Sequence, residues 1–199
     1  MMATTIPQTL LQLFREYLGT LPAEPLASYV SEINWDMAAR AVEPGTLACL
    51  GYLDRVAEIA RPEALRLVRF LAEHRQALLW QQTYTAADFG QHFVDRYGWL
   101  ELFGTRGHFA NENVAAGFLI LGPEVVYPDH HHVAEEIYVP LTGGTEWRKE
   151  TGDYLPRGAG EVIHHPSNVN HAMRTRAEPL LALYLWRAGP LAQKPVVSN

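Results

Sequence analysis

The segment YPDHHHVAEEIYVPLTG, which runs from Tyr127 to Gly143, is the part of the sequence that most restricts how the chain can fold. In an extended strand, successive side chains point to opposite faces, so residues two apart share a face. The even-numbered positions place two imidazoles, a carboxylate and a phenol on one face: His130, His132, Glu136 and Tyr138. Imidazole nitrogens and carboxylate oxygens are ligands of first-row transition metals. The segment therefore predicts a strand that carries most of a metal site.

A second segment, GEVIHHPSNVNH at residues 160–171, is the expected partner of this strand, because a metal ion needs ligands from more than one strand to be enclosed. Pro166 and Asn168 predict a tight turn, and His171 begins the strand that follows it. Six of the nine histidines lie between residues 130 and 171. Such a tract can also be incidental or a weak surface metal binder, but two spaced motifs on strand-like segments favour a built site.

Together the two segments contain H-x-H-x3-E-x6-G, from His130 to Gly143, and G-x5-P-x-N-x2-H, from Gly160 to His171. This pattern resembles the two signature motifs of the cupin superfamily, whose fold is a double-stranded β-helix barrel. The resemblance implies a metal ion on three histidines and one glutamate: His130, His132, Glu136 and His171. The other histidines of the two segments fall outside the ligand register, and we expect supporting or structural roles for them: His131, His164 and His165.

Two residues depart from the usual cupin pattern. Asn168 stands where the family usually has glycine. Asparagine tolerates the left-handed backbone conformation better than most residues, so we expect the turn to persist. Thr175 replaces a usual asparagine, which leaves the ligands untouched.

The pattern of the chain changes near residue 95. Before it, apolar residues recur at helical spacing, and helices are predicted at 6–19, 25–33, from 47 onward, 62–80 and 85–93. After it, short strands are separated by Gly, Pro, Asn and Asp, at 97–103, 115–121, 125–127, 135–141, 146–150, 161–165, 171–175 and 180–186. We therefore expect a mainly β protein with a helical N-terminal half: a cupin barrel at 95–190, flanked by a helical extension at 1–94 and followed by a tail at 191–199.

The last predicted strand has two different faces. Leu181, Leu183 and Leu185 share one face, which would suit packing against a helical layer. Tyr184 and Trp186 share the other, which would suit a cavity. Spacing alone leaves open whether these two aromatic residues line a site or are plain core residues.

Composition restricts the partners and the location of the protein. With 199 residues and a hydrophobic share of 48%, the chain fits one soluble domain of ordinary size. A net charge of −6 gives no reason to expect nucleic acid or an anionic membrane as a partner. Cys49 is the single cysteine, and the first residues predict a helix rather than a signal peptide. We expect a cytoplasmic protein, and the periplasm remains an alternative.

Tyr138 distinguishes this chain from many cupins, because a phenol lies two residues after the glutamate ligand on the same strand face. A nearby divalent cation stabilises the ionised phenol and lowers its pKa, so such a group can ligate a metal and act as a base. With Tyr127 before the motif, the HHHVAEEIYVPL run, His171 and the helical N-terminal half, the chain looks like the cupin-type dimethylsulfoniopropionate lyases, the DddQ-like group.

This second resemblance implies cleavage of dimethylsulfoniopropionate, a small sulfonium carboxylate, into dimethyl sulfide and acrylate by β-elimination. Tyr138 would be the base, with Tyr127 as the alternative. Aromatic faces attract cations, so Tyr184 and Trp186 are the expected contacts of the sulfonium.

The sequence leaves several alternatives open. The cofactor would be one divalent transition metal, with Zn²⁺ or Fe²⁺ favoured over Mn²⁺, Ni²⁺ or Co²⁺. An iron-dependent cupin oxygenase and a non-catalytic cupin that binds a small ligand are the competing functions. The N-terminal helices could serve as a lid, as plain packing or as the surface of a homodimer.

Overall fold

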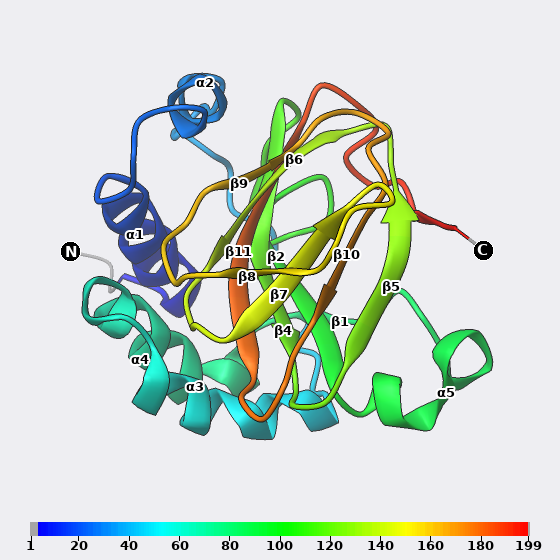
Figure 1. The fold of residues 1–199 in the computed structure, drawn as a ribbon. Helices are drawn as coiled ribbons and strands as arrows, with labels where there is room; N and C mark the ends of the chain where they lie inside the picture. Colours follow the sequence, from blue (N-terminus) through cyan, green and yellow to red (C-terminus); the bar gives the residue numbers. More distant parts are fainter. Residues whose placement is uncertain (1–3, 199) are drawn as a thin grey trace.

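Two β-sheets face each other and form a barrel, and most of the helices lie along one side of it (Figure 1). The structure is a computed structural model that describes residues 4–198. One sheet has the order β1-β2-β4-β11-β6-β9, with β3 beside β2, and the other has the order β12-β5-β10-β7-β8. All of the pairings are antiparallel except that of β2 with β3. The expected cupin-type barrel flanked by helices is therefore confirmed.

The strands are short, as the sequence predicts. In the first sheet they are β1 (Trp80–Gln81), β2 (Tyr97–Gly104), β3 (Phe109–Ala110), β4 (Val114–Leu121), β6 (Glu135–Pro140), β9 (Ile163–His165) and β11 (Leu180–Arg187). In the second they are β5 (Val126–His131), β7 (Thr145–Lys149), β8 (Leu155–Arg157), β10 (His171–Arg174) and β12 (Val196–Val197). All eight predicted strands are present, within a few residues at each end.

The helices precede the barrel strands in the chain, except that β1 comes before α5. They are α1 (Ile6–Leu18), α2 (Leu26–Ser31), α3 (Leu53–Ile59), α4 (Leu65–Glu73) and α5 (Ala86–Val94), with 3-10 turns at Ala48–Tyr52, Pro62–Ala64 and Arg75–Ala77. The predicted capping box is present at α5, where Thr85 N–H donates to the Asp88 carboxylate at 2.7 Å. Within residues 4–198, no helix combines the length and the apolarity that crossing a bilayer requires.

Two predictions from local pattern are wrong. The helix predicted at 62–80 ends at Glu73, and Trp80 instead pairs with Leu100 at the start of β1. Pairing with a distant strand overrides the helical pattern here. The predicted single strand from Tyr127 is two strands, β5 and β6, which belong to different sheets and are joined by residues 132–134. The even-numbered residues that we expected on one strand face therefore come from two sheets and point into the space between them.

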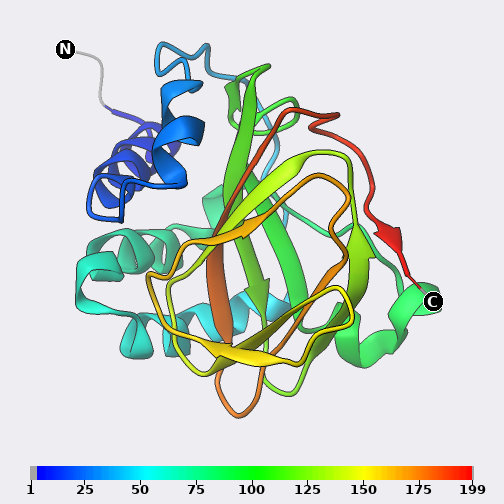
Figure 2. The same ribbon diagram turned by 45° about the horizontal axis from the view of Figure 1, so that its top comes forward.

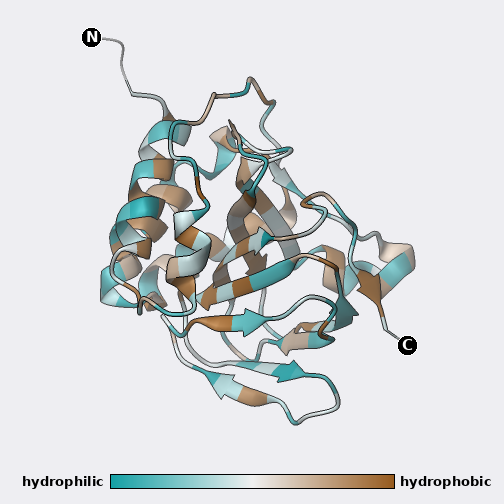
Figure 3. Ribbon diagram, turned by 90° about the horizontal axis from the view of Figure 1, so that it is seen from above, coloured by the Kyte–Doolittle hydropathy of each residue, from teal (hydrophilic) through white to brown (hydrophobic). Residues whose placement is uncertain are grey.

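The outer core lies between the helices and the seven-stranded sheet. Figure 3 shows hydrophobic residues on the helices and strands of this layer. We define the outer core by its buried residues on α1, α3, α4 and the sheet, which include Leu10, Phe14, Leu53, Leu67, Val68, Leu71, Ile137, Val139, Leu181, Leu183 and Leu185. The prediction that the β11 leucines pack against a helical layer is confirmed.

The inner core fills the barrel between the two sheets and is rich in aromatic residues. We define it by Tyr84, Phe93, Tyr97, Leu119, Tyr127, Tyr138, Trp147, Ile163, Met173, Ala182 and Tyr184, against which Trp186 also packs. Tyr184 and Trp186 alternate along β11 with the leucines of the outer core. Strand alternation therefore separates the two cores across one sheet.

The predicted tail at 191–199 contains a strand. Val196 and Val197 form β12, which pairs with His131 and His130 of β5. Figure 2 shows this C-terminal segment running along the side of the barrel. A loose tail is therefore wrong for these two residues, because the edge of β5 offers them backbone hydrogen-bond partners. The division of the chain at residues 94 and 190 stays a prediction.

Candidate active site

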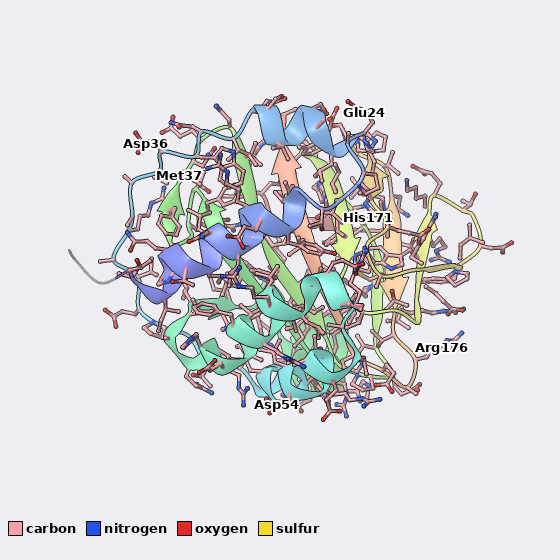
Figure 4. All side chains as sticks on the ribbon, turned by 90° about the vertical axis from the view of Figure 1, so that its left-hand side faces the viewer. Glu24, Asp36, Met37, Asp54, His171 and Arg176 are labelled. Atoms are coloured by element: carbon pink, nitrogen blue, oxygen red, sulfur yellow. The ribbon has the colours of Figure 1, made fainter. Side chains whose placement is uncertain are left out.

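The four predicted ligands come from three strands that converge inside the barrel. His130 on β5 lies opposite His171 on β10 in the strand ladder, and their ring centroids are 4.2 Å apart. His132 follows β5 directly, and Glu136 lies on β6. Figure 4 labels His171 over the strands of the barrel. All four side chains are buried.

Hydrogen bonds to the backbone fix the orientation of the three histidines. The Nδ1 atoms of His130 and His132 lie 2.8 Å from the carbonyl oxygens of Pro128 and Ala134. The Nδ1 of His171 lies 2.9 Å from the carbonyl oxygen of residue 169. Since a carbonyl only accepts, each Nδ1 carries a proton, which leaves Nε2 as the nitrogen that can bind an ion. This arrangement is typical of histidines that bind metal through Nε2.

The Glu136 carboxylate lies at the centre of the group. Its Oε2 is 3.1 Å from His132 Nε2 and 3.2 Å from His171 Nε2. Burial alone would raise the pKa of Glu136, but the two imidazoles outweigh it and hold the pKa well below its usual range. Burial lowers the pKa of His132, but the Glu136 charge outweighs it and raises that pKa overall. In His130, burial together with the charge of His171 holds the pKa well below the ordinary value.

The donor set fits a transition metal ion. Ligand atoms of His130, His132 and His171 all lie within 4.8 Å of one another, and so do those of Glu136, His165 and His171. The buried Nε2 of His171 lies 3.2 Å from Glu136 Oε2, so that one ion can contact both atoms. The site can therefore hold a metal ion.

Two tyrosines adjoin the group of ligands. Tyr138, on β6, is buried, and its ring centroid is 6.5 Å from that of His171. The Tyr127 ring stacks on His130, with centroids 4.3 Å apart, and its hydroxyl is 3.5 Å from that of Tyr84. Burial raises the pKa of both phenols well above 10, and the Glu136 charge raises that of Tyr138 further. Without an ion, both are neutral phenols at physiological pH.

Trp186 links the β11 aromatics to the ligands. Its Nε1–H donates to Glu136 Oε1 at 2.5 Å, and its ring lies 4.1 Å from that of His132, centroid to centroid. Tyr184 lies opposite Tyr138 in the pairing of β11 with β6. Both residues line the same cavity, whose volume is about 270 Å³.

This cavity brings the predicted catalytic and substrate-binding residues together. Its lining includes Tyr127, Glu136, Tyr138, Tyr184 and Trp186, together with the segment 191–195. The three histidines of the ligand group lie behind Glu136 and are absent from the lining within residues 4–198.

Sequence reasoning missed several residues around the cavity. Arg106 lines it and is paired with the buried Glu101, whose Oε2 lies 3.2 Å from Arg106 Nη2. Lys194 also lines it, with Nζ 5.2 Å from the centre of the Tyr84 ring. Neither residue is part of a motif, and both reach the cavity from loops, so no local signal marks them. His165 is buried beside the ligands, although we expected only a supporting role for it.

Comparisons with known proteins agree on one family. The family model described as dimethylsulfoniopropionate lyase matches residues 26–182. The dimethylsulfoniopropionate lyase DddQ of Ruegeria pomeroyi is 39% identical over 119 residues, which is 60% of this chain and 59% of that protein. The match therefore spans less than two thirds of that relative's length.

Solved structures resemble the chain over nearly its whole length. The crystal structure of the dimethylsulfoniopropionate lyase DddQ from Ruegeria pomeroyi has a TM-score of 0.87 and 30% identity, with 97% of this chain and 96% of that chain covered. A chain from the crystal structures of the lyases RdDddP and RnDddQII has a TM-score of 0.89 and 28% identity, with 98% of each chain covered.

Proposed function

The chain belongs to the dimethylsulfoniopropionate lyase family, and on this basis we propose that it is a metal-dependent carbon–sulfur lyase. Its substrate would be dimethylsulfoniopropionate, which carries a carboxylate at one end and a cationic sulfonium at the other. The reaction is a β-elimination that yields dimethyl sulfide, acrylate and a proton. The observation that carries the proposal is the single cavity that brings Glu136, Tyr138 and Trp186 together.

Four side chains would hold the ion: His130, His132, Glu136 and His171. A bound divalent ion, with Zn²⁺ or Fe²⁺ first among the candidates, supplies a positive charge for the substrate carboxylate and for the negative charge that develops beside it. Trp186 keeps one carboxylate oxygen of Glu136 in a hydrogen bond. The second oxygen, Oε2, faces His132 and His171. The two oxygens of Glu136 thus have separate partners.

Tyr138 is the proposed base. It removes a proton from the carbon next to the substrate carboxylate, the electron pair of that C–H bond forms the C=C bond, and the C–S bond breaks so that the sulfonium leaves as a neutral thioether. Burial and Glu136 keep the pKa of this phenol high in the metal-free protein. A cation nearby acts in the opposite direction, so the base becomes competent only in the loaded site. Tyr127 is the alternative base.

Aromatic faces would hold the sulfonium. Tyr184 and Trp186 lie on the β11 side of the cavity, and a cation over such a ring gains about 0.5–2 kcal/mol. As the thioether forms, the positive charge disappears, which weakens this contact and favours product release. The inner core therefore offers a polar end at Glu136 and an aromatic wall.

Dimethyl sulfide in the headspace above purified protein and dimethylsulfoniopropionate tests the proposal. The assay is run with chelated protein and with chelated protein reloaded separately with Zn²⁺, Fe²⁺, Mn²⁺, Co²⁺ or Ni²⁺. We expect dimethyl sulfide and acrylate in equal amounts, only in reloaded samples. Oxygen consumption without dimethyl sulfide would support an iron-dependent oxygenase instead, and binding of substrate without turnover would support a non-catalytic cupin.

A further inference from the structure

His165 lies inside the barrel and beside the proposed ligands. It is the last residue of β9 and lies opposite Glu136 in the pairing of β9 with β6. Residues directly opposite each other in an antiparallel pair point to the same face of the sheet. The ladder therefore directs the imidazole of His165 and the carboxylate of Glu136 to the same side.

Both ring nitrogens of His165 lack partners. The side chain is 1% exposed, and neither Nδ1 nor Nε2 has a hydrogen bond. Neutral imidazole offers one donor and one acceptor, and leaving such groups buried and unpaired costs about 1–3 kcal/mol each. The proposed ligands differ, because backbone carbonyls accept from the Nδ1 of His130, His132 and His171. The orientation of His165 thus leaves a nitrogen free for an ion.

Its neighbours form a second group of donors. The rings of His165 and His171 are nearly parallel, with centroids 4.1 Å apart and an angle of 14°. Donor atoms of Glu136, His165 and His171 lie within 4.8 Å of one another. His171 also belongs to the group with His130 and His132, for which the same limit holds.

We propose that His165 is a metal ligand, and that with Glu136 and His171 it forms a second position for the ion next to that of His130, His132 and His171. The inference rests on the metal dependence in the proposed function. His165 packs on the side of Trp147, with ring centroids 6.4 Å apart, and is not among the cavity-lining residues of the described chain.

Two substitutions separate a ligand from a packing residue. His165→Phe keeps a ring against His171 and Trp147 but removes both nitrogens, and His165→Gln keeps a polar side chain of similar size. The matched controls are the same two changes at His164, the preceding residue of the same strand. His164 lies on the opposite strand face, with its ring 6.1 Å from that of Tyr29.

The readouts do not depend on catalysis. They are the Zn²⁺ dissociation constant from competition with a chromophoric chelator, the visible spectrum of the Co²⁺-loaded protein, and the melting temperature of the metal-free protein. We expect both His165 variants to raise the dissociation constant at least 10- to 100-fold, the range typical of losing even an indirect partner, and to change the Co²⁺ spectrum. The His164 variants should do neither. Metal-free His165→Phe should melt at or above the wild-type temperature, because it removes two unpaired nitrogens.

A folded His165→Phe variant with wild-type Zn²⁺ affinity and an unchanged Co²⁺ spectrum would overturn the inference. If neither variant folds, NMR of the wild-type protein tests the inference through the ring ¹⁵N signals of its histidines. Zn²⁺ should shift the bonded-nitrogen signals of His165 together with those of His130, His132 and His171, and a shift confined to the latter three overturns it. A wild-type protein that binds no ion would instead contradict the proposed metal dependence, with or without lyase activity.

Discussion

The outer core and the inner core lie on opposite faces of one sheet and differ in composition. The outer core is dominated by leucines on α1, α3, α4 and β11. The inner core consists mainly of aromatic rings and adjoins four buried histidines and a buried glutamate. Leucine packing stabilises a fold, whereas buried imidazoles and a buried carboxylate are groups that can bind a metal ion. The difference teaches that this barrel separates the residues that hold it together from those that bind and react.

Tyr138→Phe is the change expected to affect activity most. Loss of a general base lowers the rate about 10²–10⁴-fold, while the four proposed metal ligands remain. The measurement is kcat from headspace dimethyl sulfide, together with the metal content of the purified variant. Tyr17→Phe is the matched control, because it also removes a buried tyrosine hydroxyl, but one that lies in the outer core. Unchanged turnover in Tyr138→Phe would make Tyr127 the base to test next.

Leu183→Ala should show the reverse behaviour. Leu183 is fully buried in the outer core, so its truncation leaves a cavity and should cost about 2–5 kcal/mol of the free energy of unfolding. That corresponds to roughly 4–20 °C in melting temperature. Urea unfolding measures the loss, and turnover per folded molecule at a low temperature should stay at the wild-type value. A drop in turnover without a drop in stability would break the separation of the two cores.

Acid should destabilise the metal-free protein through the inner core. The pKa values of His130 and His165 lie well below the ordinary value, mainly because of burial. Below about pH 6.5 the unfolded chain therefore binds more protons at these residues than the folded chain does. The free energy of unfolding of the metal-free protein therefore decreases as the pH is lowered. The raised pKa of His132 contributes in the opposite direction, as stability that is lost when the pH rises through that pKa.

Melting temperatures of chelated protein between pH 8 and pH 5 test this prediction. We expect the melting temperature to decrease steadily below about pH 6.5. With bound Zn²⁺ the decrease should begin at a lower pH, because the ion keeps the imidazoles unprotonated. His165→Phe should make the melting temperature of the metal-free protein depend less steeply on pH, since it removes a histidine whose pKa lies well below the ordinary value. A flat profile in the metal-free protein would show that these imidazoles titrate normally.

Trp186→Leu should have the smallest effect. Loss of one cation–π contact of about 0.5–2 kcal/mol corresponds to a rise in KM of roughly 2- to 30-fold. Trp186→Phe separates two contributions, because it keeps an aromatic face but loses the hydrogen bond to Glu136. An intermediate KM for the Phe variant supports the aromatic contact, and a KM equal to that of the Leu variant points to the hydrogen bond. Steady-state kinetics of dimethyl sulfide release distinguishes them.

The features that sequence predicted correctly are those with a local or repeating signal. The capping box of Thr85 and Asp88, the alternation of β11 and the short strands after residue 95 each follow from neighbouring residues. Asn168 has the left-handed backbone that the turn requires, with φ of 60°. The placement of the ligands came from two spaced motifs and a family resemblance.

The features that sequence reasoning missed depend on pairing between distant parts of the chain. Trp80 leaves its helical pattern because Leu100 of β2 pairs with it, and Val197 is ordered against His130 across 67 residues. His165 falls outside the ligand register of the motif, and its place beside Glu136 comes from the pairing of β9 with β6. Helical spacing and motif registers carry no information about such neighbours.

The alternation along β11 has a consequence for how proteins with this barrel can diverge. Tyr184 and Trp186 reach the cavity, whereas Leu181, Leu183 and Leu185 reach the helices. A mutation at Tyr184 or Trp186 changes the wall of the cavity, and one at any of the three leucines changes the packing of the sheet against the helices. Selection for substrate and selection for stability therefore act on different residues of a single strand. A related protein can change its cavity while the packing of the helices on the sheet stays the same.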